Sequence, residues 1–339
     1  MQMRYRTKLI CAACIMPLAA LIFSLSWGRY PLSFIKILSI LFRTDAFAAV
    51  TTADYNIFMN IRLPRTLFVF LSGGAIGLSG VSLQSLFRNP LVAPDIIGVS
   101  TGASLGAAIG IVLLHTSAAG IQICAFAGGI GATLLVLQLS NIGGEHSLIR
   151  LVLAGVIINA LAGAGVSLIK YMADPLNELP ALEFWLMGCF NVITWKKLAA
   201  FLPIAVAGCS FIILFRRQLN ILSLGDEEAA SLGTPVKKMR LLFIITSTLL
   251  VASVVSAAGI ISWIGLIAPH VIRLLFGNNN YKVAPLSFMC GAALLLFADT
   301  VARSLSGNEI PVSIITAVIG APILAQLMLR RNNDIWIGI

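Results

Sequence analysis

The side chains that could do chemistry are few, and the densest group of charges lies in one short stretch. Residues 222–240 read "LSLGDEEAASLGTPVKKMR" and separate two long apolar runs. Consecutive acidic residues from Asp226 to Glu228 favour the N-terminus of a helix, and Gly233 with Pro235 would end that helix after about two turns. For an arbitrary charged segment, a solvated loop would be the simplest explanation.

No arrangement of residues in the sequence suggests catalysis or a metal site. The three histidines, His115, His146 and His270, are far apart, and none has HExxH spacing. Cys11 and Cys14 form a CxxC, but it lies inside an apolar run without a second pair. The chain also lacks a GxxxxGK(S/T) phosphate-binding loop. We therefore expect no enzymatic activity, metal or cofactor in this chain.

Composition identifies the solvent in which the chain folds. Hydrophobic residues make up 59% of the 339 residues, and the mean hydropathy is +0.98. A spanning helix needs about 20 apolar residues, and irregular backbone cannot face lipid. We therefore predict an all-α, polytopic membrane protein in which residues 1–339 form one transmembrane domain. The ten predicted helices lie near residues 9–27, 64–87, 95–114, 118–140, 148–171, 197–216, 240–258, 259–276, 284–304 and 310–329.

The distribution of basic residues predicts which helix ends face the cytoplasm. With the N-terminus inside, most lysines and arginines lie in cytoplasmic segments, as the positive-inside rule requires, and both termini are cytoplasmic. The net charge of +10 fits such a membrane protein better than a nucleic-acid-binding protein. The main exceptions lie on the outer side and are Arg29, Lys36, Arg43, Arg62 and Arg65.

Glycine spacing predicts close packing between helices. Gly102, Gly106 and Gly110 recur every four residues and so share one helix face, as do Gly73 and Gly77. Small residues at this spacing let helix backbones approach closely. We interpret both stripes as packing contacts in a compact bundle.

A turn rich in proline is predicted between the second and third helices. Pro90 restricts the residue before it and would end the second helix at Asn89. Pro94 and Asp95 would open the third helix, with Asp95 satisfying free N–H groups at its start. A helix cap explains this turn without a ligand.

An ion-coupled secondary transporter is the main alternative function. Such a protein usually carries Asp, Glu or His near the bilayer centre. The acidic residues here fall in loops or near helix ends. Asp299 is closest to an exception, but Arg303 lies four residues later and could pair with it on the same helix.

Five segments resemble the FecCD family, the permease subunits of type II ABC importers for iron chelates, haem and vitamin B12. They cover nearly the whole chain in the order of the family: "RLPRTLFVFLSGGAIGLSGVSLQSLFRNPLVAPDIIGVSTGASLG", "LGDEEAASLG", "GLIAPHVIR", "ADTVAR" and "EIPVSIITAVIGAP". The resemblance implies a ten-helix permease fold in a bacterial inner membrane. It also implies a second permease subunit, expected to be an identical copy, two cytoplasmic ATPase subunits and an extracytoplasmic binding protein. Iron-siderophore is the first expected cargo, with haem, cobalamin or molybdate as alternatives.

The resemblance assigns the charged stretch to ATPase coupling. In the family, the segment corresponding to "LGDEEAASLG" is a short helix that fits a cleft on the ATPase subunit. The residues expected to carry this role are Gly225, Asp226, Glu227, Glu228 and Gly233.

Three outer arginines match the positions of the family's docking arginines. We expect Arg62, Arg65 and Arg303 to hold surface carboxylates of the binding protein, since the planar guanidinium group suits paired hydrogen bonds to a carboxylate. The alternative role is structural. Arg62 and Arg65 would then anchor a helix end at the lipid headgroups, and Arg303 would pair with Asp299.

Two further predictions concern the passage through the membrane. Residues 140–150, "SNIGGEHSLIR", join the fourth and fifth helices on the cytoplasmic side, and Gly143 and Gly144 give the backbone the freedom of a hinge. We expect this loop to close the passage, a movement that cross-linking at Ser147 would detect. By resemblance the fifth and tenth helices flank the passage, and Asn159 in the fifth would either line it or bond a neighbouring helix.

Overall fold

The computed structural model describes residues 15–30, 32–42, 50–142, 148–305 and 309–329, and these residues are helical apart from their connections. The N-terminal helix spans Ile15–Ser26. The others are α2 (Phe34–Phe42), α3 (Thr52–Asn56), η1 (Ile57–Arg62), α4 (Leu63–Leu86), η2 (Pro94–Ile97), α5 (Val99–Ala108), η3 (Ile109–Leu113), α6 (Ala118–Ser140), α7 (Leu148–Met172), α8 (Glu178–Met187), α9 (Trp195–Leu214), α10 (Arg216–Leu222), α11 (Asp226–Ser231), α12 (Val236–Ala258), α13 (Ile264–Phe276), α14 (Asn280–Ala302) and α15 (Val312–Leu329).

Each of the ten predicted apolar runs coincides with a helix. Within the described residues, six helices are long and apolar enough to cross a membrane, and they are Thr52–Leu86, Ala118–Ser140, Leu148–Met172, Trp195–Leu214, Val236–Ala258 and Asn280–Ala302. Four shorter apolar helices, Ile15–Ser26, Val99–Leu113, Ile264–Phe276 and Val312–Gln326, occupy the remaining four runs. The predicted boundary between residues 240–258 and 259–276 is confirmed, because α12 ends at Ala258 and Gly259 has a positive φ of 79°.

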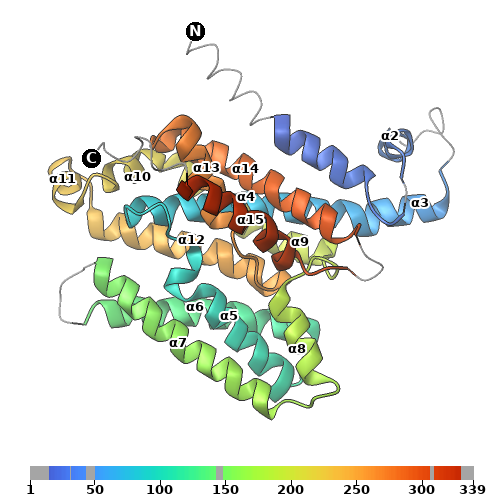
Figure 1. Ribbon diagram of the computed structural model, residues 1–339, viewed down its shortest axis with the longest axis horizontal. Coiled ribbons are helices and arrows are strands. Elements are labelled where there is room, and N and C mark those ends of the chain that lie inside the picture. The colour runs from blue at the N-terminus through green and yellow to red at the C-terminus, as the bar shows by residue number, and fades with distance from the viewer. Residues whose placement is uncertain (1–14, 31, 43–49, 143–147, 306–308, 330–339) are drawn as a thin grey trace, which may run out of the picture.

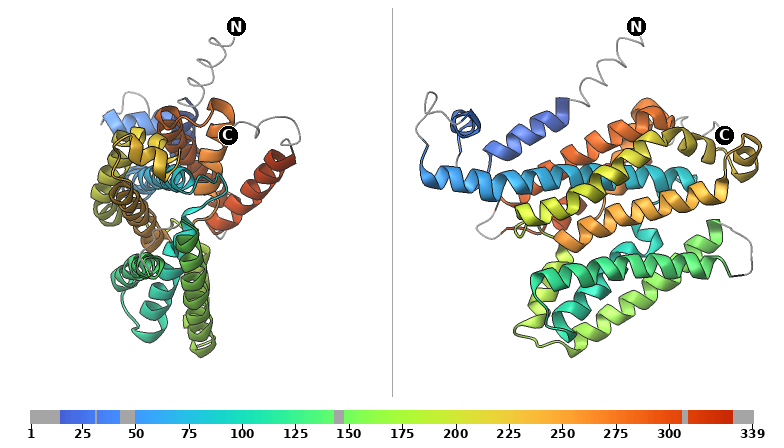
Figure 2. Two further views of the ribbon diagram at one scale, coloured as in Figure 1. Left: turned by 90° about the vertical axis from the view of Figure 1, so that its left-hand side faces the viewer. Right: turned by 180° about the vertical axis from the view of Figure 1, so that it is seen from behind.

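The helices form two groups that meet at α12. Figure 1 and Figure 2 show α5, α6, α7 and α8 lying together beside the group that contains α4, α9, α13 and α14. Helix α12 packs on α4 and α9 in one group and on α5 and α6 in the other. Burial follows this arrangement, since the apolar windows of α4, α12 and α14 are 83%, 72% and 72% buried, whereas those of α6, α7 and α9 are 28%, 22% and 28% buried. The outer helices therefore present most of their surface to lipid or to another subunit.

The predicted glycine stripes are packing contacts. A Cβ atom built on Gly73 would lie 2.3 Å from the carbonyl oxygen of Gly291 in α14. On α5, a Cβ on Gly106 would lie 2.1 Å from the carbonyl oxygen of Cys124 in α6. Backbones approach this closely only where both faces lack side chains. The stripes therefore fix α4 on α14 and α5 on α6.

We expect Gly73→Ala to destabilise the bundle, whereas Gly163→Ala should not. The first change forces α4 and α14 apart, at a cost typical of overpacking, about 1–3 kcal/mol. The second adds a methyl group that would meet nothing within 4 Å, and alanine favours helix over glycine. Thermal unfolding of the two detergent-purified variants compares these effects. Equal melting temperatures would show that the contact has room to relax.

The connection between α4 and α5 differs from the prediction. Helix α4 ends at Leu86 rather than Asn89, because Arg88 adopts a left-handed φ of 50° and the Asn89 N–H bonds back to the Gln84 carbonyl at 3.1 Å. Helix α4 therefore ends before the position at which Pro90 would interrupt it. Residues Pro94–Ile97 form a separate 3-10 turn, and the Asp95 carboxylate accepts a hydrogen bond from the Ser100 hydroxyl group instead of capping α5 directly.

Candidate functional site

The charged stretch forms α11, a short helix at one end of the bundle (Figure 1). Gly225 precedes it with a φ of 147°, and a Cβ at this position would lie 2.1 Å from a carboxylate oxygen of Glu228. Gly233 follows it with a φ of 76°, and its N–H bonds to the Ala230 carbonyl at 2.9 Å. Both positions require glycine for conformational reasons. The predicted helix and its predicted end are confirmed.

Several contacts hold α11 against the bundle. Asp226 forms an ion pair with Arg240 of α12, and Ala229, a residue of α11 itself, is fully buried. The preceding helix α10 is tied to α14, because the Asn280 N–H donates to Asn220 Oδ1 at 2.7 Å and Asn220 Nδ2 donates to Asn279 Oδ1 at 3.0 Å. A force applied to α11 is therefore transmitted to two central helices.

The free face of α11 is acidic in the middle and apolar at both ends. Glu227 and Glu228 are exposed, and Leu224 and Leu232 are 57% and 60% exposed. We call these four residues the coupling surface. Sequence reasoning identified the glutamates and missed the two leucines, although both leucines stand inside the "LGDEEAASLG" motif, where an apolar residue beside a charged helix could have been noticed.

A second charged cluster lies near the opposite end of α4. Arg65 donates to Asp299 of α14, with Nη2 2.7 Å from Oδ1, and to Glu309 before α15, with Nη1 2.9 Å from Oε1. Arg65 is 5% exposed and Asp299 is fully buried. Arg303 Nε lies 3.8 Å from Asp299 Oδ2, so the expected pairing within α14 is present but secondary to Arg65. This cluster joins the ends of α4, α14 and the segment leading to α15.

The other two predicted docking arginines also have acceptors inside the chain. Arg62 is 4% exposed and donates to the carbonyl oxygens of Leu25 at 2.8 Å and Tyr30 at 2.7 Å, so it caps the end of the N-terminal helix. Arg303 is 7% exposed and donates to the Ser24 hydroxyl oxygen at 2.9 Å. The structure therefore brings Arg62, Arg65 and Arg303 to one end of the bundle, but it turns their guanidinium groups inward. Sequence reasoning missed Glu309 as a partner.

Asn159 bonds neighbouring segments. Its Nδ2 donates to the Asp95 carbonyl at 3.1 Å, and its Oδ1 accepts a hydrogen bond from Thr101 of α5. Of the two roles that the sequence left open, the bond to a neighbouring helix is confirmed, while a place on the passage stays a prediction. The predicted gate residues Gly143, Gly144 and Ser147 lie outside the described residues.

The described part of the chain holds no group of three or more His, Cys, Asp or Glu side chains arranged to bind a metal ion. His270 is buried in α13. His115 lies at the surface, where its Nδ1 is 3.3 Å from Glu178 Oε1. Asp299, the acidic residue closest to an intramembrane position, is held by Arg65. An ion-coupled transporter would need an acidic group that exchanges its partner during transport. This geometry therefore favours the permease class that the sequence resembles over an ion-coupled transporter.

Comparison with known proteins identifies that class. The model of the FecCD transport family matches residues 16–330. The molybdate import system permease protein MolB of Haemophilus influenzae is 38% identical over 326 residues, 96% of each chain. The hemin transport system permease protein HmuU of Yersinia pestis is 37% identical over 307 residues, 88% of this chain and 90% of HmuU.

A solved structure gives the same result for the fold. A chain described as an inward-facing conformation of a metal-chelate type ABC transporter matches with a TM-score of 0.86 and 37% identity, covering 96% of this chain and 99% of the other. The family match, the relatives and this structural likeness agree with the ten apolar helices and with the exposed α11. The chain therefore belongs to the FecCD transport family and is a permease subunit of an ABC importer.

Proposed function

We propose that two copies of this chain form the passage of an importer in the inner membrane of a bacterium, with each copy bound by one cytoplasmic ATPase subunit. The coupling surface carries this proposal. It combines exposed acidic and apolar groups on a helix that is fixed to the bundle by Asp226 and Ala229. With an ATPase subunit bound at the coupling surface, α11 and both termini would lie on the cytoplasmic side. ATP–Mg is then bound by the ATPase, because this sequence has no phosphate-binding loop.

The exposed outer helices support a paired assembly. Helix α7 buries only 22% of its apolar window, and its exposed residues include Leu153, Ile157 and Leu161. Residues 151–169 contain no charged side chain. A wall of this kind suits a bulky cargo that passes without tight binding, provided that a separate extracytoplasmic protein supplies selectivity. Helices α7 and α15 of both copies would enclose the passage.

We propose a metal chelate as the cargo, with an iron-siderophore ranked first and haem or cobalamin as the alternative chelates. The oxyanion molybdate is the alternative outside this class. MolB and HmuU are almost equally similar to this chain, although their names refer to molybdate and hemin. Overall similarity therefore does not separate the cargoes. The absence of charge between Leu151 and Ile169 favours a bulky chelate, for which the passage need offer only width.

An uptake assay separates these cargoes. The chain would be reconstituted in liposomes with its ATPase and binding protein, and ATP-dependent accumulation of labelled ferric siderophore, hemin, cobalamin and molybdate would be compared. We expect accumulation of the ferric siderophore alone. Accumulation of molybdate alone would refute the chelate assignment while leaving the importer assignment intact. A reconstituted complex that lacks either nucleotide or binding protein is the control.

Docking of the binding protein through Arg62, Arg65 and Arg303 stays a prediction. Docking would require Arg65 to exchange its contacts with Asp299 and Glu309 for contacts with carboxylates of the binding protein. If docking uses these charges, stimulation of ATP hydrolysis by the binding protein should fall as salt concentration rises, since rim charge pairs are screened. Arg303→Lys would test the planar geometry while keeping the charge. Undiminished stimulation in that variant and at high salt would contradict the docking role.

A further inference from the structure

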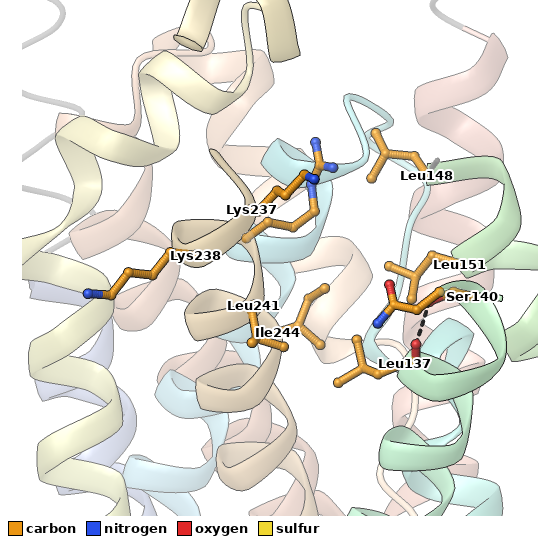
Figure 3. Close-up of a pocket in the computed structure, with 10 residues that line it drawn as sticks. Leu137, Ser140, Leu148, Leu151, Lys237, Lys238, Leu241 and Ile244 are labelled. Atoms are coloured by element: carbon orange, nitrogen blue, oxygen red, sulfur yellow. Dashed lines mark hydrogen bonds between the residues drawn. The ribbon is translucent and has the colours of Figure 1, made fainter. Parts of the chain in front are cut away.

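A pocket of about 370 Å³ opens between α6, α7 and α12. Figure 3 shows Leu241 and Ile244 of α12 on one side, with Leu137 and Leu151 facing them from α6 and α7. The pocket lies at the end of α6 and at the starts of α7 and α12. All three are apolar helices long enough to cross the bilayer. The pocket is therefore level with one surface of the membrane.

The upper edge of this pocket is basic. Lys237, Lys238 and Arg240 line it from the start of α12. The two lysines are exposed and form no hydrogen bond or ion pair with their side chains in the described part of the chain. Arg240 pairs with Asp226 through Nη2, but its Nε is buried without a hydrogen-bond partner among the described residues. The Lys237 side chain and the buried Arg240 Nε donor therefore lie at the edge, whereas the Lys238 ammonium group points away from the pocket (Figure 3).

The start of α12 adds positive potential to these charges. Pro235 precedes the helix and makes no side-chain cap, and the first turn contains no acidic residue. Free N–H groups give a helix N-terminus a partial positive charge, which basic side chains nearby make less favourable. A helix that is stabilised by its own sequence would carry acidic rather than basic side chains near its N-terminus. An anion at the edge would relieve this repulsion.

We propose that the pocket binds an anionic phospholipid. The phosphate group would lie near Lys237 and Arg240 Nε, and an acyl chain would contact Leu137, Leu151, Leu241 and Ile244, whose positions Figure 3 shows. A free phosphate ion would use only the basic edge, and an uncharged lipid would use only the apolar walls. Basic pockets between membrane helices typically bind anionic headgroups. The proposal does not depend on which cargo is carried.

Photo-cross-linking in nanodiscs tests the proposal. The chain in complex with its ATPase would be placed in phosphatidylcholine nanodiscs that contain either photoactivatable phosphatidylglycerol or photoactivatable phosphatidylcholine, and labelled peptides would be identified by mass spectrometry. We expect phosphatidylglycerol to label the pocket several-fold more strongly. Lys237→Gln should lower that labelling by about fivefold, while labelling by phosphatidylcholine stays unchanged.

Two further variants separate the contributions. Arg217→Gln removes the same charge from an exposed position on α10 and should leave labelling as in the native protein. Leu241→Trp would fill the pocket without changing charge and should reduce labelling by both lipids. Equal labelling of the native pocket by the two lipids would overturn the proposal. So would displacement by excess inorganic phosphate with no effect of Leu241→Trp, which indicates a phosphate site, or labelling that vanishes when the ATPase binds, which indicates an ATPase contact.

Discussion

Replacing Glu227 and Glu228 with lysine is expected to abolish ATP-driven transport while the protein still folds and reaches the membrane. Both side chains are exposed on the free face of α11, and neither takes part in an ion pair among the described residues. Reversed charge at an interface costs several kcal/mol, so the amount of ATPase that co-purifies should fall by at least about tenfold. Affinity purification of the complex and transport in liposomes measure the two effects.

Glu183→Lys is the matched control for this double variant. Glu183 has 47% of its side chain accessible and pairs with Lys170 at 2.9 Å, but it lies in α8, away from α11 (Figure 1). Its reversal should leave co-purification of the ATPase unchanged. Normal transport and normal co-purification in the Glu227/Glu228 variant would show that α11 is not the contact. Loss of both in the control would show a general effect of added positive charge.

Arg65→Met is expected to destabilise the protein by about 3–5 kcal/mol, since it leaves the buried Asp299 carboxylate without its main partner. Arg65→Met/Asp299→Leu should recover much of this loss, because replacing both members of a buried ion pair with apolar groups is often close to neutral. Glu309 is 23% accessible and can be hydrated once Arg65 is gone. Thermal unfolding of the purified single and double variants gives the comparison.

The same double variant separates the structural role of Arg65 from docking. If it is stable and the binding protein still stimulates ATP hydrolysis fully, Arg65 serves the bundle alone. If it is stable and stimulation is lost, Arg65 also contacts the binding protein. A single variant as stable as the native chain would contradict the importance of the Arg65–Asp299 pair for the fold. Basal ATP hydrolysis serves as the internal control in each case.

The number and positions of the spanning helices could be predicted from the sequence because lipid imposes a local rule. A backbone without water must satisfy its own hydrogen bonds, so each apolar run has to be a helix wherever it packs. Helix α11 could also be predicted, since the acidic residues that favour its start and the glycine that ends it, Gly233, act over only a few residues. The end of α4 was misplaced by the same kind of reasoning, because the left-handed conformation of Arg88 is not apparent from its side chain.

Only the tertiary structure decided which partners the buried charges have. Arg65 and Asp299 are separated by 234 positions, and Arg62 reaches the carbonyl of Leu25 across 37. Local spacing instead suggested Arg303 for Asp299, and the resemblance to the family suggested an outward role for the arginines. The basic edge at Lys237 and the apolar wall at Leu137 likewise lie far apart in the chain. Burial and pairing depend on how helices pack together, and one-dimensional spacing records only the contacts that a helix makes with itself.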